Sequence, residues 1–343
     1  MPKPLLWKPI PEQIANSQMS SFRRFVNKIF QLNLKDYHQL YTWSVSNSKD
    51  FWESFWEFSN IIFSEPYTQI CSDISKMPGA KWFPGAKLNF AENLLRYQDD
   101  AIALKFYGED KVYREITYAQ LYTEVEQFAG ALRDMGIQKG DRIVGFIPNI
   151  PETIIAMLAT SSIGAIWSSS SPDFGIKGVL DRFSQIDPKV VVAANGYYYK
   201  GNSFDSLEKL NEILIDLPSV ERVVIVNYTE KEDISHIPNG VWWNNFLCSS
   251  TTSLKFEQLS FDHPLYIMYS SGTTGKPKSI VHSVGGTLIQ HLKELILHTD
   301  LKRNDTIFYF TTCGWMMWNW LVSALASKAS IVLFDGSPMY KKK

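Results

Sequence analysis

The amino-acid sequence predicts an α/β protein that contains two sheets in succession, preceded by a helical extension. From about residue 101, short apolar runs rich in β-branched residues alternate with segments of helical periodicity. The same alternation resumes after an irregular stretch, residues 228–262. The first hundred residues lack this alternation and instead place aromatic side chains at helical spacing. Strands that alternate with helices in this way are typical of βαβ units and a mainly parallel sheet.

The aromatic residues of the N-terminal part indicate a packing helix. In the segment DFWESFWEFSNIIF, residues 50–63, helical spacing places on one face Phe51, Phe55, Phe58 and Ile62. A stack of aromatic rings could instead hold a ligand, but such stripes far more often pack against a core. We therefore predict a helix that packs within the extension.

The first set of alternating elements begins with a strand pair, residues 101–108 and 112–117. Thr117 and Gln120 have the spacing of a capping box, so a helix is expected to start after Thr117. Pro151 suits the first turn of the next helix. Further strands are expected over residues 142–147, 165–169, 189–193 and 222–227, and further helices over residues 151–164, 175–186 and 204–217.

The second set contains a strand over residues 265–270 and, after a glycine-rich loop, a helix over residues 286–300. Residues 306–310, 316–326 and 330–334 then predict the strand, helix and strand of another βαβ unit. The uncharged stretch within this last region is long enough for a membrane span. Its division into β-branched, helical and again β-branched parts favours a buried core segment instead.

Composition limits the classes of function. Basic and acidic side chains number 34 and 35, and the formal net charge is −1, so neither nucleic acid nor a membrane is an expected partner. The cysteines Cys71, Cys248 and Cys313 are odd in number and far apart, which predicts neither a disulfide framework nor a metal site. The N-terminus lacks the apolar core of a signal peptide. A cytoplasmic location is therefore expected.

The strongest chemical signal is the stretch YSSGTTGKPKSIVHS, residues 269–283. A turn of glycine, serine and threonine after a strand directs backbone N–H groups into one concavity, which binds anions. The residues predicted to contact a polyphosphate are Ser270, Ser271, Gly272, Thr273, Thr274, Gly275, Lys276 and Lys278. A Walker A loop is excluded, since Ser270 stands where that motif has glycine and Pro277 follows Lys276. A surface hairpin without a ligand is the alternative, which the hydroxyls and lysines disfavour.

This stretch resembles the phosphate-binding signature of the adenylate-forming acyl-CoA synthetases. The resemblance implies that the loop holds the β- and γ-phosphates of ATP, together with Mg²⁺, while a substrate carboxylate attacks the α-phosphorus. Thr274 and Lys278 fall on the family's catalytic positions, and Lys276 falls on a looser one. Positioned donors and cations of this kind stabilise pyrophosphate as it leaves.

The resemblance extends from about residue 38 to residue 338 and points to the acetoacetate-activating branch of the family. The segments that carry it are WFPGAKLNFAENLLR, DRFSQIDPKVVVA, TTCGWMMWN, LFDGSP and the long run that starts at GDRIVGF. It implies an acetyl-CoA-synthetase-type extension over residues 36–96. It also implies an incomplete AMP-binding ligase domain over residues 97–343.

The family also implies an acyl pocket. Trp315, Met316 and Met317 would line it, because soft, adaptable methionines suit an acyl chain slightly larger than acetyl. Core packing within the βαβ unit is the alternative for this segment. We prefer that alternative for Trp318 and Trp320.

The segment GYYYKGNSFD, residues 196–205, resembles the part of these enzymes that meets CoA. The family has an arginine and a lysine where this chain has Tyr198 and Asn202, so the match is incomplete. Lys200 could supply positive charge from a neighbouring position, which makes Lys200, Gly201 and Asn202 the candidate CoA contacts. A solvated loop is an equal alternative.

Several elements of the family are not found in these 343 residues. They include a Tyr-Gly-x-Thr-Glu element for adenine and Mg²⁺, an acidic residue for ribose, a hinge and a small C-terminal domain. The resemblance therefore implies an ATP-dependent acetoacetate–CoA ligase in truncated form, which a complementing C-terminal polypeptide would complete. The alternatives are a non-catalytic remnant with weak nucleotide binding, or specificity for acetate or propionate. We expect the isolated chain to be poorly soluble and to lack ligase turnover.

Overall fold

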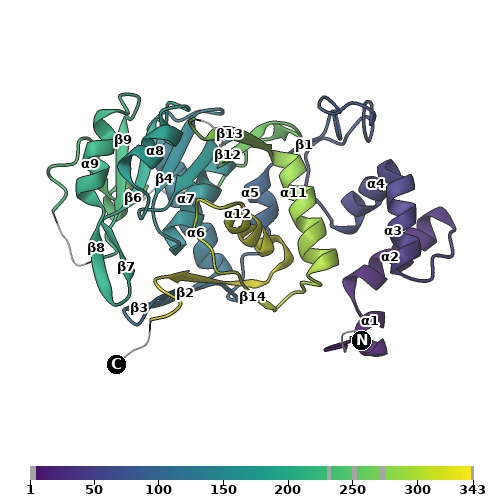
Figure 1. Cartoon of the computed structure of the whole chain (residues 1–343). Helices are drawn as coiled ribbons and strands as arrows, with labels where there is room; N and C mark the ends of the chain where they lie inside the picture. Colours follow the sequence, from purple (N-terminus) through teal and green to yellow (C-terminus); the bar gives the residue numbers. More distant parts are fainter. Residues whose placement is uncertain (1–4, 230–232, 249–252, 271–274, 341–343) are drawn as a thin grey trace.

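The structure is a computed structural model that describes residues 5–229, 233–248, 253–270 and 275–340. Two main sheets form the body of the molecule, and helices pack between them and around them (Figure 1). The larger sheet has seven strands in the order β10-β9-β6-β4-β5-β12-β13, and the smaller has four in the order β14-β15-β2-β3. The described chain thus has the predicted α/β architecture.

The seven-stranded sheet contains the buried strands that the sequence predicts. Its strands are β4 (Arg142–Phe146), β5 (Ile166–Ser170), β6 (Val190–Ala194), β9 (Arg222–Val226), β10 (Gly240–Trp242), β12 (Pro264–Ser270) and β13 (Lys278–Ser283). All neighbouring pairs are parallel except β12–β13. Alternate residues face opposite sides, so Val190 and Val192 join one apolar cluster while Val191 joins the other.

Helices cover both faces of this sheet. The helices α8 (Ile176–Phe183) and α9 (Leu207–Ile215) pack on one face, and α7 (Pro151–Ser162) packs on the other. Every residue of α7 is buried, which places it at the centre of the molecule (Figure 1). The helix α6 (Tyr118–Asp134) lies against α7 and begins with the predicted capping box of Thr117 and Gln120.

The four-stranded sheet corrects one expectation about topology. It contains β2 (Ile102–Gly108), β3 (Val112–Thr117), β14 (Thr306–Phe308) and β15 (Ser330–Asp335). The strand β15 pairs in parallel with β2, more than 200 positions earlier in the chain, so the two sheets do not follow one another in succession. Local patterns predict the elements, but this pairing depends on contacts between distant segments. The last βαβ unit is confirmed, because β14 and β15 are parallel neighbours joined through α12 (Met316–Val322) and the 3₁₀ helix η2 (Ser323–Ser327).

The N-terminal part is helical, as expected. Its helices are α1 (Pro11–Ala15), α2 (Gln18–Phe30), α3 (Tyr37–Ser46), α4 (Ser48–Phe58) and α5 (Phe90–Leu94). The ring of Phe22 in α2 lies 5.6 Å from that of Phe51, 5.8 Å from that of Phe55 and 5.2 Å from that of Phe58 in α4, so the aromatic stripe does pack against a core. The helix ends at Phe58, however, and the prediction that Ile62 belongs to the same helical face is wrong. Asn60 has a φ of 52°, a left-handed conformation that turns the chain away from the helix.

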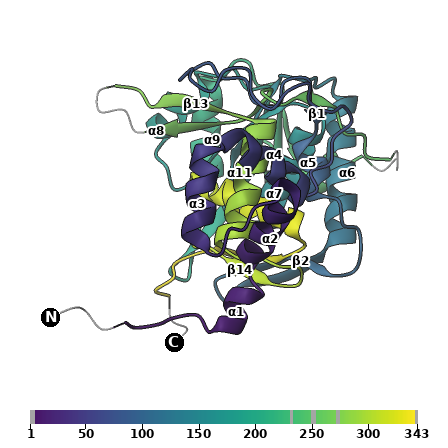
Figure 2. The same cartoon turned by 90° about the vertical axis from the view of Figure 1, so that its right-hand side faces the viewer.

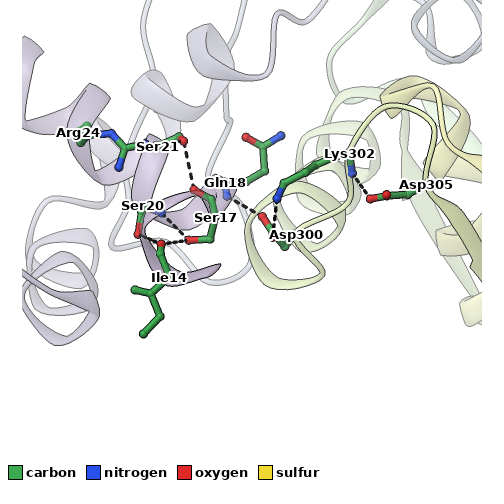
Figure 3. Close-up of polar contacts among 9 residues, drawn as sticks. All are labelled: Ile14, Ser17, Gln18, Ser20, Ser21, Arg24, Asp300, Lys302 and Asp305. Atoms are coloured by element: carbon green, nitrogen blue, oxygen red, sulfur yellow. Dashed lines mark hydrogen bonds and ion pairs between the residues drawn. The ribbon is translucent and has the colours of Figure 1, made fainter. Parts of the chain in front are cut away.

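A polar contact attaches this helical part to the body. The helix α11 (Val284–Lys293) continues into the π-helical turn η1 (Glu294–His298), and α2 and α4 lie in front of them in Figure 2. Just beyond η1, the carboxylate of Asp300 accepts a hydrogen bond of 2.6 Å from the backbone N–H of Gln18, the first residue of α2 (Figure 3). Lys302 forms an ion pair of 3.0 Å with the same carboxylate. A carboxylate at a helix N-terminus is favourable because it offsets the unpaired N–H groups there.

The remaining elements are short. They are β1 (Lys87–Leu88) paired with β11 (Leu259–Ser260), β7 (Gly196–Tyr199) paired with β8 (Asn202–Asp205), and α10 (Trp243–Phe246). The segment around residues 306–334 is a strand, a helix and a strand, as predicted. In the part of the chain that the structure describes, no helix is both long and apolar enough to cross a bilayer.

Candidate functional site

The glycine-rich stretch connects two antiparallel strands. Ser270 at the end of β12 pairs with Lys278 at the start of β13, and Tyr269 pairs with Ser279. The sequence predicted that a helix would be the next element after the loop, but β13 intervenes and α11 begins only at Val284. The β-branched pair Ile280 and Val281 was the signal for that strand. Of the predicted phosphate contacts, Ser271, Gly272, Thr273 and Thr274 lie outside the described residues.

Residues 275–278, the part of this turn that the structure describes, leave their polar groups accessible. Gly275 has a φ of 100°, a conformation that L-residues with a side chain rarely adopt. Among the described residues, no atom lies within 4 Å of the position that a Cβ on Gly275 would take. Lys276 and Lys278 are exposed, and Ser270 is half-buried. The structure therefore brings Ser270, Gly275 and the two lysines together at one end of the hairpin.

The ends of β12 and β13 that adjoin the turn are attached to residues at the end of α8 and just after it. The side-chain amide of Gln185 donates a hydrogen bond of 2.9 Å to the carbonyl of Pro277 and accepts one of 3.1 Å from the hydroxyl of Ser279. On β12, the hydroxyl of Tyr269 donates a hydrogen bond of 3.0 Å to the carbonyl of Arg182. Burial raises the pKa of Tyr269 to about 12, so this hydroxyl stays protonated at neutral pH. These contacts fix both strands while leaving the lysines free to meet a ligand.

Basic side chains surround the single carboxylate of Asp181 on α8. The pKa of Asp181 is lowered, mainly because Lys177 donates a hydrogen bond of 2.8 Å to it, and Lys276 and Arg182 add weaker attraction. Asp181 and Lys177 neutralise each other, so Lys276 and Lys278 give the turn a positive charge. Arg182, the next residue along the chain, lies over the ring of Phe174, 4.8 Å from its centroid.

His282, close behind the glycine-rich turn in sequence, lies on β13. Its ring centroid is 4.9 Å from that of Tyr266 on β12. Burial lowers the pKa of His282, which keeps the imidazole neutral at pH 7. We therefore assign it to packing between the two strands.

The predicted acyl-pocket residues lie at the start of α12. Trp315 and Met316 are exposed, with 63% and 46% of their surface accessible, and Met317 is half-buried. A cavity of only about 10 Å³ lies beside them; the residues around it include Gly314, Asn319 and Met268. That volume holds at most one water molecule, so among the described residues Trp315 and Met316 form one lining face beside a cavity too small for an acyl chain.

The two tryptophans that follow belong to the core, as preferred from the sequence. Trp318 is fully buried, and its indole N–H donates a hydrogen bond of 2.8 Å to Asn149. Trp320 is partly buried and packs against the same apolar cluster. The start of α12 is also held against the seven-stranded sheet, because Ser169 of β5 donates a hydrogen bond of 2.7 Å to the carbonyl of Cys313. The face formed by Trp315 and Met316 thus lies beside the strands that lead to the glycine-rich turn.

The candidate CoA contacts form the turn of the β7–β8 hairpin. Lys200 and Gly201 have φ values of 52° and 79°, and Tyr199 pairs with Asn202 across the turn. The backbone N–H groups of Lys200 and Gly201 each donate a hydrogen bond of 2.7 Å to the carboxylate of Glu109. The ammonium of Lys200 lies 5.4 Å from the centroid of the Tyr199 ring. Sequence reasoning missed Glu109, because it is 91 positions away and no local pattern connects it to this turn.

No metal centre emerges from the part of the chain that the structure describes. Those residues contain no group of three or more His, Cys, Asp or Glu side chains placed to hold an ion. His291, for example, is buried and shares a hydrogen bond of 2.8 Å with the hydroxyl of Ser323. Burial lowers the pKa of His291 to about 3, so it stays neutral.

Comparisons with known proteins agree with this arrangement. The sequence model of the AMP-binding enzyme family matches residues 90–343, and that of the acetyl-coenzyme A synthetase N-terminus matches residues 37–94. The chain is 49% identical to acetoacetyl-CoA synthetase of Mus musculus over 98% of its own length and 51% of that protein. It is 46% identical to acetoacetyl-coenzyme A synthetase of Rhizobium meliloti, over 97% of this chain and 51% of the relative.

A comparison with solved structures leads to the same family. Acetoacetyl-CoA synthetase from Streptomyces lividans superimposes with a TM-score of 0.92 at 40% identity, covering 98% of this chain and 52% of that one. The chain therefore spans about half the length of the relatives it matches, the N-terminal half in each comparison of sequence and fold. Because the family model covers most of its residues, the chain belongs to the AMP-binding enzyme family.

Proposed function

We propose that this chain supplies the ATP-phosphate and acyl contacts of an AMP-forming ligase that joins acetoacetate to CoA. The β12–β13 hairpin carries the proposal, because its described part combines a glycine at positive φ, two exposed lysines and strand ends held by Gln185 and by Arg182 of α8. The similarity to acetoacetyl-CoA synthetases over nearly the whole chain supports it. We also propose residues 36–96 as a helical extension and residues 97–343 as the ligase part.

The proposed reaction has two steps. A carboxylate oxygen of acetoacetate attacks the α-phosphorus of ATP, the bond from that phosphorus to the bridging oxygen breaks, and pyrophosphate leaves. The thiolate of CoA then attacks the acyl carbon, the bond to the AMP oxygen breaks, and AMP leaves. In the first step negative charge grows on pyrophosphate, so donors and cations near it lower the barrier.

We assign the phosphate contacts to the turn residues. Lys278 and Lys276 would stabilise the β- and γ-phosphates by charge, and Thr274 with the neighbouring hydroxyls and N–H groups would donate hydrogen bonds. Mg²⁺ would add neutralisation of the phosphate oxygens when bound. At such sites it is held largely by phosphates and water with one or two carboxylates, so we assign it no ligand among the described residues.

Substrate choice is assigned to the start of α12. Met316 and Met317 have flexible thioether side chains that can adapt to the extra carbons of acetoacetate relative to acetate. Their partial exposure means that the wall facing them has to come from a further segment or from a rearrangement. An acetate- or propionate-specific site is the competing assignment, and it predicts that the shorter acid binds more tightly than acetoacetate.

Calorimetric titration of ATP with Mg²⁺ into the chain tests the phosphate assignment. Lys278→Ala and Thr274→Ala should each weaken ATP binding by about tenfold or more, because each removes a charged or polar contact to phosphate. Lys28→Ala, at an exposed lysine of α2, is the matched control and should leave the affinity unchanged. Equal ATP affinity in the wild-type chain and both turn variants would remove the hairpin from the mechanism.

A further inference from the structure

Three segments that are distant in sequence meet at the carboxylate of Glu109. Glu109 lies in the turn between β2 and β3, beside the turn of the β7–β8 hairpin and the residues that follow β15 (Figure 1). Its Oε1 accepts hydrogen bonds from the backbone N–H groups of Lys200 at 2.7 Å and Ser337 at 2.8 Å. Its Oε2 accepts a further one from Gly201 at 2.7 Å. Hydrogen bonds to an ionised carboxylate are roughly twice as strong as neutral ones.

Two glycines leave room for the side chains of Glu109 and Tyr340 beside the backbone. A Cβ built on Gly336 would overlap the Cγ of Glu109, and Gly336 has a φ of 135°, so only glycine fits there without strain. A Cβ on Gly201 would lie 2.7 Å from the ring of Tyr340. The half-buried carboxylate therefore occupies a space that the surrounding chain leaves open for it.

A second acidic residue holds the adjoining strand of the same hairpin. Asp335, at the end of β15, is buried, and its Oδ2 accepts a hydrogen bond of 3.2 Å from the backbone N–H of Tyr198 in β7. The backbone of Glu109 itself donates to the carbonyl of Asp335 at 3.1 Å. The hairpin is thus attached to the four-stranded sheet at one strand and at its turn.

These contacts limit how the turn can meet a ligand. The N–H groups of Lys200 and Gly201 already donate to Glu109, so they are not available to a phosphate. The side chain of Lys200 is exposed and remains the group that can meet an anion. The location of this side chain depends on the conformation of the turn, and the hydrogen bonds to Glu109 hold that conformation.

We infer that Glu109 is a positioning residue, which fixes the β7–β8 turn so that the side chain of Lys200 is presented to a phosphate of CoA. This inference rests on the proposed ligase function and on the CoA contact that the family resemblance implies for Lys200, Gly201 and Asn202. It assigns Glu109 no contact with substrate and no part in a chemical step.

Amide hydrogen exchange measured on the chain tests the attachment directly. In Glu109→Ala the backbone amides of Lys200, Gly201 and Ser337 should exchange about tenfold faster or more than in the wild type, since their acceptor is lost. Glu109→Gln keeps an acceptor oxygen without the charge and should give an intermediate increase. Glu115→Ala removes an exposed carboxylate from the neighbouring strand β3 and serves as the control. Unchanged exchange at all three amides in Glu109→Ala would overturn the inference.

A CoA titration on the same variants tests the consequence. The affinity for CoA should fall about threefold in Glu109→Ala while the affinity for ATP stays constant, since the two hairpins are separate. Faster exchange with unchanged CoA affinity would contradict the positioning role. If the wild-type chain bound no CoA, the proposed CoA role would fail, and the exchange comparison would still decide whether Glu109 anchors the turn.

Discussion

Two hairpins of this molecule each have a glycine in the left-handed region beside a lysine, but their surroundings differ. At the β12–β13 turn, no described atom comes within 4 Å of a Cβ on Gly275, and Lys276 is exposed. At the β7–β8 turn, the ring of Tyr340 packs on Gly201, and the carboxylate of Glu109 accepts hydrogen bonds from the turn amides. The described residues of the first turn leave Gly275 and Lys276 accessible to an external anion, whereas the carboxylate of Glu109 occupies the second turn.

This difference shows that lysine and glycine content alone does not predict whether a turn can bind an external anion. Both turns contain lysine and glycine, and both resemble ligand-binding segments of the family. Backbone N–H groups bind an external phosphate only if no protein acceptor has taken them. That condition depends on Glu109, which comes from a different part of the chain.

The largest expected effect concerns Asp335, which helps to hold the second hairpin. Burial raises the pKa of this carboxyl from about 3.8 to about 6, Glu109 and Asp173 add repulsion, and the hydrogen bond from Tyr198 acts in the opposite direction. A carboxyl with a raised pKa in the folded state stabilises the protein below its unfolded pKa and loses that contribution as pH rises through the folded pKa.

The matching measurement is urea unfolding at several pH values for the wild type and Asp335→Asn. The free energy of unfolding of the wild type, relative to the variant, should fall by about 3 kcal/mol between pH 3 and pH 7. Asp110→Asn, an exposed neighbour in the β2–β3 turn, should show no such trend. A flat difference for Asp335→Asn would mean that this carboxyl is not held in a buried environment.

A smaller effect separates the two glycines. Gly275→Ala should cost about 1 kcal/mol of unfolding free energy, because alanine is strained at positive φ. Gly201→Ala should cost about 3 kcal/mol, since its Cβ also meets the ring of Tyr340. Thermal or chemical denaturation measures both values. Equal losses would show that the second turn is no more closely packed than the first.

The smallest expected effect is the loss of CoA affinity when Lys200 is replaced, which is to be compared with the loss of ATP affinity when Lys278 is replaced. Lys200→Ala should weaken CoA binding about threefold, the loss expected for one exposed charge pair, and should leave ATP binding unchanged. Lys278→Ala should weaken ATP binding about tenfold or more, as proposed above, and should leave CoA binding unchanged. If each variant lost affinity for both ligands, the two turns would belong to a single site.

Much of the fold could be predicted because its signals are local. The alternation of buried strands and amphipathic helices between Ile102 and Val226 predicted most elements found there, including the capping box at Thr117, but not the β7–β8 hairpin. The pairing of β15 with β2 could not be predicted, because contacts between distant segments decide it. The strand β13 was missed because the segment was assigned entirely to the loop that precedes α11.

The residues of the candidate site likewise fall into those that a local sequence motif indicates and those that only the folded chain brings together. Lys276, Lys278 and Gly275 stand together in a short motif, so one stretch of sequence pointed to them. Trp318 was assigned to the core by its apolar surroundings, and its burial is confirmed. Glu109 had no motif, since its role depends on the approach of Gly201 and Ser337 in the folded chain.

We propose above that the β12–β13 hairpin binds the terminal phosphates of ATP. Inorganic pyrophosphate with Mg²⁺ is the most direct probe, because it contains those phosphates without the nucleoside. Calorimetric titration should detect pyrophosphate binding to the wild-type chain and to Gly201→Ala, with affinity about tenfold lower in Lys278→Ala. Equal affinity in all three proteins, or no binding to the wild type, would contradict the account.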